Sequence, residues 1–156
     1  QRPGPGRRPC CRPAIHHPGR ATMQDQYDDL QQSYGRCLRG KGFIERFYDI
    51  FLASHPDIAP MFADTDFQKQ RMALRRGISI AISHAAGGSL VRQSMEHMAD
   101  VHSRKGHAPV APRYYSLWVD SLVQAVSEMD PEFSPKLGER WRAGMGVVVA
   151  TFTARY

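Results

Sequence analysis

Apolar residues recur every three or four positions through most of the chain after residue 24, and this period constrains the fold more than any other feature. The clearest example is residues 43–52, where Phe43, Phe47 and Phe51 follow one another at four-residue intervals. This spacing places the three rings on one face of an α-helix. The sequence contains no β-hairpin signal and no internal repeat. We therefore expect an all-α domain with six or seven helices and short connections.

Capping and turn residues divide this helical pattern into segments. The expected boundaries are a first turn at Pro56, a capping box at Thr65 and Gln68, an end at Gly87-Gly88, a helix near 90–103, a loop over 106–112, and helix starts at Pro112 and at Ser134-Pro135.

The net charge of +6 is unevenly distributed along the chain. Residues 1–22 contain five arginines and no acid, so they carry all but one of the net positive charges. They are also rich in Pro and Gly, which predicts a disordered tail followed by a domain over residues 23–156. Met23 is the expected true start of translation. Because the domain itself is nearly neutral, we do not expect its folded part to bind nucleic acid.

Several absences bear on the compartment. No run approaches 18 consecutive apolar residues, so we expect no membrane-spanning helix. The three cysteines, Cys10, Cys11 and Cys37, form no disulfide framework. Residues 1–22 lack the apolar stretch of a signal peptide. Together these observations favour a cytoplasmic protein.

One ordered set of residues indicates a family. Along the chain these are Phe47-Tyr48-Asp49, His55-Pro56, Phe62, Gln70-Arg71-Met72-Ala73-Leu74 and His102. In this order they resemble the globins, and among them the bacterial single-domain haemoglobins and the haem domain of flavohaemoglobins. The resemblance covers residues 25–155. It implies a globin fold that encloses one haem b, iron protoporphyrin IX.

The resemblance implies that His102 is the residue that ligates the iron. Met98 lies one turn earlier in the same helix, and we expect its backbone carbonyl to accept the N–H of the other ring nitrogen. Two other interpretations stay open from the residues alone. A histidine at a helix end also complements the helix dipole, and His107, in a loop bounded by Gly and Pro, is a rival ligand.

The resemblance places Tyr48, Gln70 and Leu74 on the opposite face of the haem. Tyr48 offers an O–H and Gln70 an N–H to a bound gas, and a low dielectric strengthens both hydrogen bonds. Leu74 lies one turn beyond Gln70 and would supply bulk, while Phe62 matches the ring that packs on the haem. The segment between Phe62 and Gln70 is shorter than in flavohaemoglobins, so an inward-facing Lys69 is the alternative to Gln70.

The resemblance also bears on redox chemistry. In flavohaemoglobins a tyrosine and a glutamate support the proximal histidine. Tyr115 matches that tyrosine as part of the haem site, but the place of the glutamate falls at about Tyr156, so this carboxylate is missing. The sequence contains no Gly-rich phosphate loop for a dinucleotide. We therefore expect that any redox turnover needs an external reductase.

These features favour reversible binding of O2, and also of NO or CO, at ferrous haem. The first alternative is a nitric oxide dioxygenase that relies on an external reductase. The second is a gas-sensing module whose state is detected by a partner protein. The third is a haem-free helical interaction module with a basic tail that binds nucleic acid.

Overall fold

The structure is a computed structural model that describes residues 26–156. The predicted tail over residues 1–22 and the predicted start at Met23 lie outside the described residues. The described part contains seven α-helices and no strand, which confirms the all-α prediction. The helices are α1 (Asp28–Arg39), α2 (Phe43–Ala53), α3 (Ile58–Met61), α4 (Phe67–Ala85), α5 (Arg92–Val101), α6 (Tyr115–Met129) and α7 (Pro135–Ala154). None of these helices is long and apolar enough to cross a membrane.

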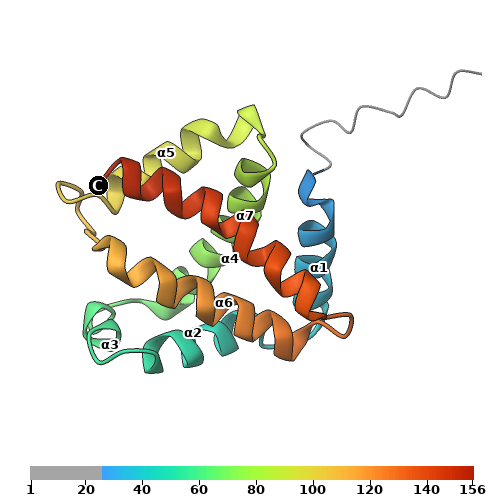
Figure 1. Ribbon diagram of the computed structural model, residues 1–156. Coiled ribbons are helices and arrows are strands. Elements are labelled where there is room, and N and C mark those ends of the chain that lie inside the picture. Colours follow the sequence, from blue (N-terminus) through green and yellow to red (C-terminus); the bar gives the residue numbers. More distant parts are fainter. Residues whose placement is uncertain (1–25) are drawn as a thin grey trace, which may run out of the picture.

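The core lies around α6 and α7, which run side by side through the middle of the fold (Figure 1). Helix α2 packs against α6, and α4 packs against α7. Phe43 and Phe47 of α2, Leu122 of α6, and Trp141 and Met145 of α7 are almost completely buried. The apolar period of α2 therefore marks the face that it buries, which is the main source of its stability.

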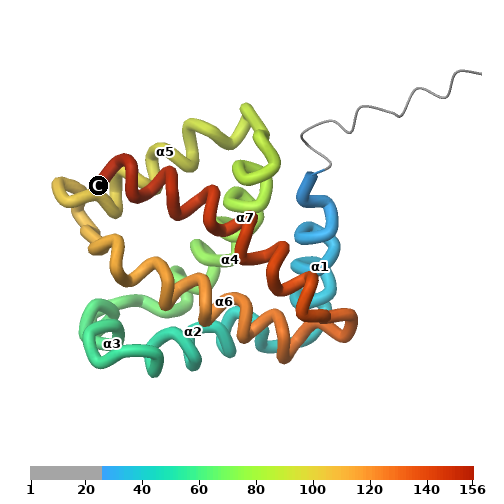
Figure 2. The backbone as a smooth tube through the Cα atoms, in the orientation of Figure 1, coloured from blue at the N-terminus to red at the C-terminus, as the bar shows by residue number. Residues whose placement is uncertain are grey.

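Helices α4 and α5 meet at a tight turn and diverge from it, as the backbone trace shows (Figure 2). Gly87 in this turn has a φ of 81°, a left-handed conformation that favours glycine and ends the helix. Helix α5 then packs on α4 and α7. Its last turn lies beside the end of α7. There Asp100 forms an ion pair with Arg155, with Oδ1 of the carboxylate 2.8 Å from Nε of the guanidinium. The ends of α5 and α7 are thus held together.

Of two predicted helix N-caps, the one of α7 is confirmed and the one of α4 is wrong. The predicted capping box at Thr65 and Gln68 is wrong, because Asp66 is the N-cap and its Oδ1 accepts the backbone N–H of Gln68 at 3.0 Å. A carboxylate also complements the positive end of the helix dipole, which favours Asp66 over its neighbour Thr65. Ser134 caps α7 as predicted, and its Oγ accepts the N–H of Leu137 at 3.1 Å.

Three other boundaries shift by a few residues. Pro56 lies in the turn that precedes α3, which begins at Ile58. The helix expected near 90–103 consists of a 3₁₀ turn over Ser89–Val91 followed by α5. Pro112 opens a 3₁₀ turn over Pro112–Tyr114, and α6 follows directly.

Candidate functional site

His102 lies at the C-terminal end of α5, and its ring is oriented by the loop that follows. Nδ1 is 3.0 Å from the backbone carbonyl oxygen of Ala108. The loop folds back to reach this position, since Val110 donates its N–H to the carbonyl of His102 at 3.0 Å. A carbonyl oxygen accepts and never donates, so Nδ1 carries the ring proton. The lone pair of the neutral imidazole is therefore on Nε2, which makes no hydrogen bond to any described residue.

The prediction that the Met98 carbonyl accepts the hydrogen bond from this N–H is wrong. That oxygen accepts the backbone N–H of His102 at 3.2 Å, as the helical ladder requires. The Ala108 carbonyl accepts the hydrogen bond from Nδ1 instead, and this bond fixes the tautomer and the ring orientation. The rival histidine, His107, lies in the same loop and is exposed, whereas His102 is half-buried.

Aromatic side chains from α6 and α7 support the His102 ring. Phe152 of α7 packs against it with ring centroids 5.9 Å apart, and the ring of Tyr115 meets Phe152 edge-on at 5.7 Å. Burial raises the pKa of Tyr115, and the neighbouring Tyr156 raises it further. No carboxylate within residues 26–156 hydrogen-bonds to the side chain of His102 or Tyr115. Sequence patterns did not indicate that Phe152 contacts the histidine, because the contact joins residues fifty positions apart.

Tyr48 lies on α2 in a cluster of aromatic rings. It is 5% exposed and meets Phe62 and Phe67 edge-on, with centroid distances of 5.9 and 5.5 Å. Burial raises the pKa of Tyr48, and an interaction with the side chain of Gln70 offsets part of this effect. The phenol is therefore protonated at neutral pH. Its O–H can therefore donate a hydrogen bond, and Phe67 and Gln70 of α4 lie close to it.

Helix α4 presents Gln70 and Leu74 one turn apart, so that they share a face. Both side chains are half-buried, while Lys69 is 86% exposed. Lys69 therefore faces solvent, and the alternative in which it faces inward is wrong. Two turns beyond Gln70, Gly77 approaches α5, since a Cβ placed there would lie 4.0 Å from the sulfur of Met98. Helices α4 and α5 thus pack closely at this point.

The chemistry of these side chains fits a haem. The donor set contains the imidazole of His102, whose Nε2 makes no hydrogen bond to any described residue, and an imidazole nitrogen with a lone pair is the form that ligates iron. Phe62, Leu74 and Met98 are packed against the core on one side and only partly buried, so each keeps apolar surface for a flat apolar ligand. The polar groups beside them are the O–H of Tyr48 and the amide of Gln70, and neither carries a charge.

Comparison with known proteins decides the family. The family model of the globins matches residues 45–152, which is more than half of the chain. This chain belongs to the globin family. The globin is also similar to a solved structure, a protein of Pseudomonas aeruginosa PAO1 described as structurally highly homologous to a human haemoglobin. The two share 37% sequence identity and a TM-score of 0.79, over 84% of this chain and 98% of the Pseudomonas chain. No curated protein matches this globin.

The family assignment confirms the globin fold that the ordered residues indicated, and globins as a family bind haem. Sequence reasoning missed two residues beside His102, Ala108 and Phe152, and a backbone carbonyl such as that of Ala108 leaves no signature in the residue type.

Proposed function

We propose that this globin binds O2 reversibly at a ferrous haem b that is ligated by Nε2 of His102. The observation that carries the proposal is the hydrogen bond between Nδ1 of His102 and the Ala108 carbonyl. It fixes the tautomer with its lone pair on Nε2, and a metal-ligating histidine requires such a partner for its other nitrogen. When bound, the haem supplies the iron at which a diatomic gas such as O2, NO or CO binds.

The remaining residues of the site divide into packing and donor groups. We expect Phe62, Leu74 and Met98 to hold the haem by apolar contact, because they are the half-buried apolar side chains next to the two clusters. Tyr115 acts through Phe152, which it contacts, and so helps to hold the His102 ring in place. Leu74 also restricts the room beside Gln70.

Tyr48 and Gln70 provide hydrogen-bond donors for the bound gas. An oxygen ligand gains negative charge when it binds ferrous iron, so a nearby donor slows its release. The O–H of Tyr48 is well suited to this task, because burial keeps it protonated and surrounds it with apolar rings that strengthen the bond. The nitric oxide dioxygenase alternative gains no support here, since His102 and Tyr115 lack a carboxylate partner among the described residues.

The role of Tyr48 is tested by Tyr48→Phe. The variant loses one hydrogen bond to a partly charged ligand and keeps the ring packing, so we expect O2 dissociation to accelerate by about 10- to 100-fold. Oxidation of the ferrous haem should accelerate as well, since water and protons reach a less protected ligand. Stopped-flow release of O2 and the rate of ferric haem formation measure the two effects.

A matched control is Tyr34→Phe. Tyr34 is also buried, but its O–H donates to the carbonyl of Arg75 at 2.6 Å, on the other side of α4. This variant should change neither rate by more than about twofold. Unchanged rates in Tyr48→Phe would remove the proposed role of the tyrosine, whereas equal changes in both variants would point to a general loosening of the fold.

A further inference from the structure

A groove on the outer face of the molecule lies between α1 and α4, away from the cluster around His102. Its volume is about 650 Å³. Its lining consists of Gln31, Tyr34, Gly35, Leu38, Met72, Arg75, Arg76 and Ser79, among which there is no acid. The O–H of Tyr34 binds the carbonyl of Arg75 and so ties the two walls together. The groove is thus a fixed feature of two packed helices.

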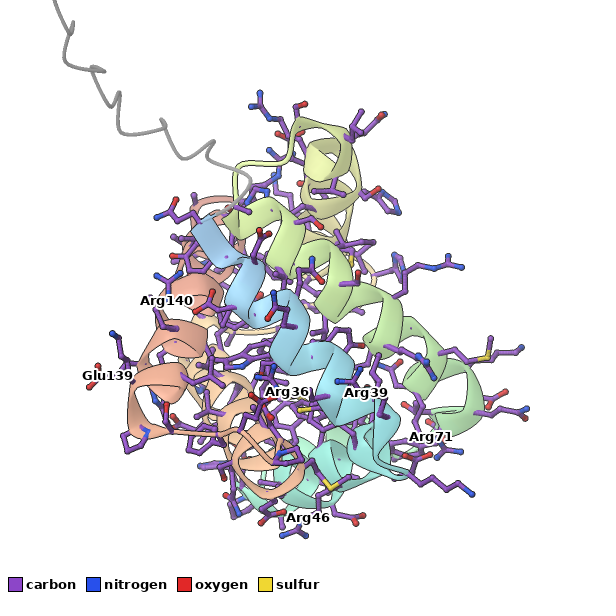
Figure 3. All side chains as sticks on the ribbon, turned by 90° about the vertical axis from the view of Figure 1, so that its right-hand side faces the viewer. Arg36, Arg39, Arg46, Arg71, Glu139 and Arg140 are labelled. Atoms are coloured by element: carbon purple, nitrogen blue, oxygen red, sulfur yellow. The ribbon has the colours of Figure 1, made fainter. Side chains whose placement is uncertain are left out.

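The charge of this groove is not neutralised within the described chain. Figure 3 views this side of the molecule, and four of the five arginines that it labels have carboxylate partners. Arg36 pairs with Asp130, Arg46 with Glu128, Arg71 with Glu45 and Arg140 with Asp29. Within residues 26–156, Arg75 and Arg76 on the groove wall form no ion pair, and neither does Arg39 at the end of α1. The excess positive charge of this face is therefore concentrated along the groove.

The groove also has an apolar part. Met72 is 69% exposed, an unusual degree for a large apolar side chain on a surface helix, and it lies beside the half-buried Leu38. An apolar strip flanked by unpaired cations is typical of a surface that receives a protein segment of opposite charge.

Gly35 keeps the groove open. It lies in the middle of α1, where glycine costs about 1 kcal/mol relative to alanine. Neither of the usual reasons for a glycine applies, because its φ is not positive and a Cβ at this position would meet no atom within 4 Å. A larger side chain would fit the fold and would project into the groove. The glycine therefore preserves space that nothing in the described chain fills.

We infer that this groove docks an acidic, amphipathic helical segment of a partner protein. A helix can lie between α1 and α4 with its apolar residues on Met72 and Leu38 and its carboxylates on Arg75 and Arg76. A nucleic acid is the less suitable occupant, because the aromatic ring in the groove, Tyr34, is 4% exposed and cannot stack on a base. The inference is independent of the haem and of the function proposed above.

The test uses the full-length protein and a fluorescein-labelled 16-residue helical peptide with leucine on one face and glutamate on the other. We expect binding with a Kd of about 10–100 μM at low salt, typical of a small interface, and weaker binding as salt rises. Gly35→Trp, which fills the groove, and the charge reversal Arg75→Glu/Arg76→Glu should each weaken binding at least about tenfold. Fluorescence anisotropy measures the Kd, and circular dichroism shows that both variants are folded.

The matched control is Arg92→Glu/Lys136→Glu, which changes the net charge by the same amount at exposed residues outside the groove. It should alter the Kd by less than about threefold. The inference is overturned if the acidic peptide does not bind, or if the control pair weakens binding as much as the groove pair. Tighter binding of a lysine-substituted peptide, or of a single-stranded oligonucleotide that Gly35→Trp blocks, would equally contradict it.

Discussion

Replacing His102 with glycine is expected to weaken haem binding by at least about 100-fold. Mutation of the groups that merely orient a metal ligand costs about 10- to 100-fold in metal affinity, so loss of the ligand itself should cost more. The backbone need not change, because His102 follows the last turn of α5 and glycine tolerates a helix end. Titration of haem into the purified protein, followed by visible absorption, gives the affinity.

Two controls assign this effect to the imidazole. Added imidazole should restore a histidine-like spectrum to His102→Gly, since it can occupy the space vacated by the ring. His107→Gly should bind haem like the unmodified protein, because His107 is exposed and its ring has no fixed partner among the described residues. Loss of haem in His107→Gly with retention in His102→Gly would reverse the assignment.

The second large effect is expected at Asp130, a buried carboxylate that joins three parts of the fold. Its Oδ1 accepts from Nε of Arg36 at 2.7 Å and from the backbone N–H of Glu132 at 2.9 Å. Its Oδ2 accepts from the hydroxyl of Ser33 at 2.7 Å. That hydroxyl in turn accepts the indole N–H of Trp141 at 3.0 Å. The network thus connects α1, the end of α6 and the fully buried tryptophan of α7.

Asp130→Ala should lower the free energy of unfolding by about 3–5 kcal/mol, the usual cost of removing one partner from a buried charged pair. The variant leaves the hydroxyl of Ser33 and the backbone N–H of Glu132 without their acceptor, and Arg36 keeps only the exposed carboxylate of Glu132, 3.1 Å from its Nε. Urea unfolding measures the change. Asp120→Ala serves as the control, because Asp120 pairs with Arg142 at 2.5 Å on the exposed surface. That variant should cost less than about 1 kcal/mol.

The same carboxylate makes stability depend on pH. Burial alone would raise the pKa of Asp130, but the hydrogen bonds from Arg36, Ser33 and Glu132 together lower it below the ordinary value. A lowered pKa in the folded state means that the stabilisation is complete above the unfolded value of about 3.9 and is lost as the pH falls through the lowered pKa. The difference between the unmodified protein and Asp130→Ala should therefore be constant near pH 7 and shrink below about pH 4. A difference that persists unchanged to lower pH would exclude this account.

The helices could be predicted from local patterns because each buries one apolar face. Phe43 and Phe47, spaced by four, are both buried against the core, as the period requires. The N-cap of α4 was harder to predict than the helix itself, because Thr65 and Asp66 are adjacent residues of types that both cap helices. The capping-box pattern favoured Thr65, and the charge of Asp66 decided otherwise.

Interactions between segments far apart in the chain could not be predicted in this way, because they leave no periodic pattern in the sequence. Asp130 binds Ser33 and Arg36, which lie more than ninety residues earlier in the chain, and no spacing rule connects them. The orientation of His102 depends on how the loop after α5 folds back to bring the Ala108 carbonyl to the ring. The roles of His102 and Tyr48 are predictions from the order of residues that resembles the family, whereas the groups that contact their side chains depend on the fold.

Reversible O2 binding is tested by repeated exposure of the reduced, haem-loaded protein to O2 and then to nitrogen. Visible absorption spectra are recorded at each stage. We expect a five-coordinate ferrous spectrum and an oxygenated spectrum to interconvert over several cycles with shared isosbestic points. Conversion to ferric haem at the first exposure, or a ferrous spectrum that O2 does not change, would contradict it.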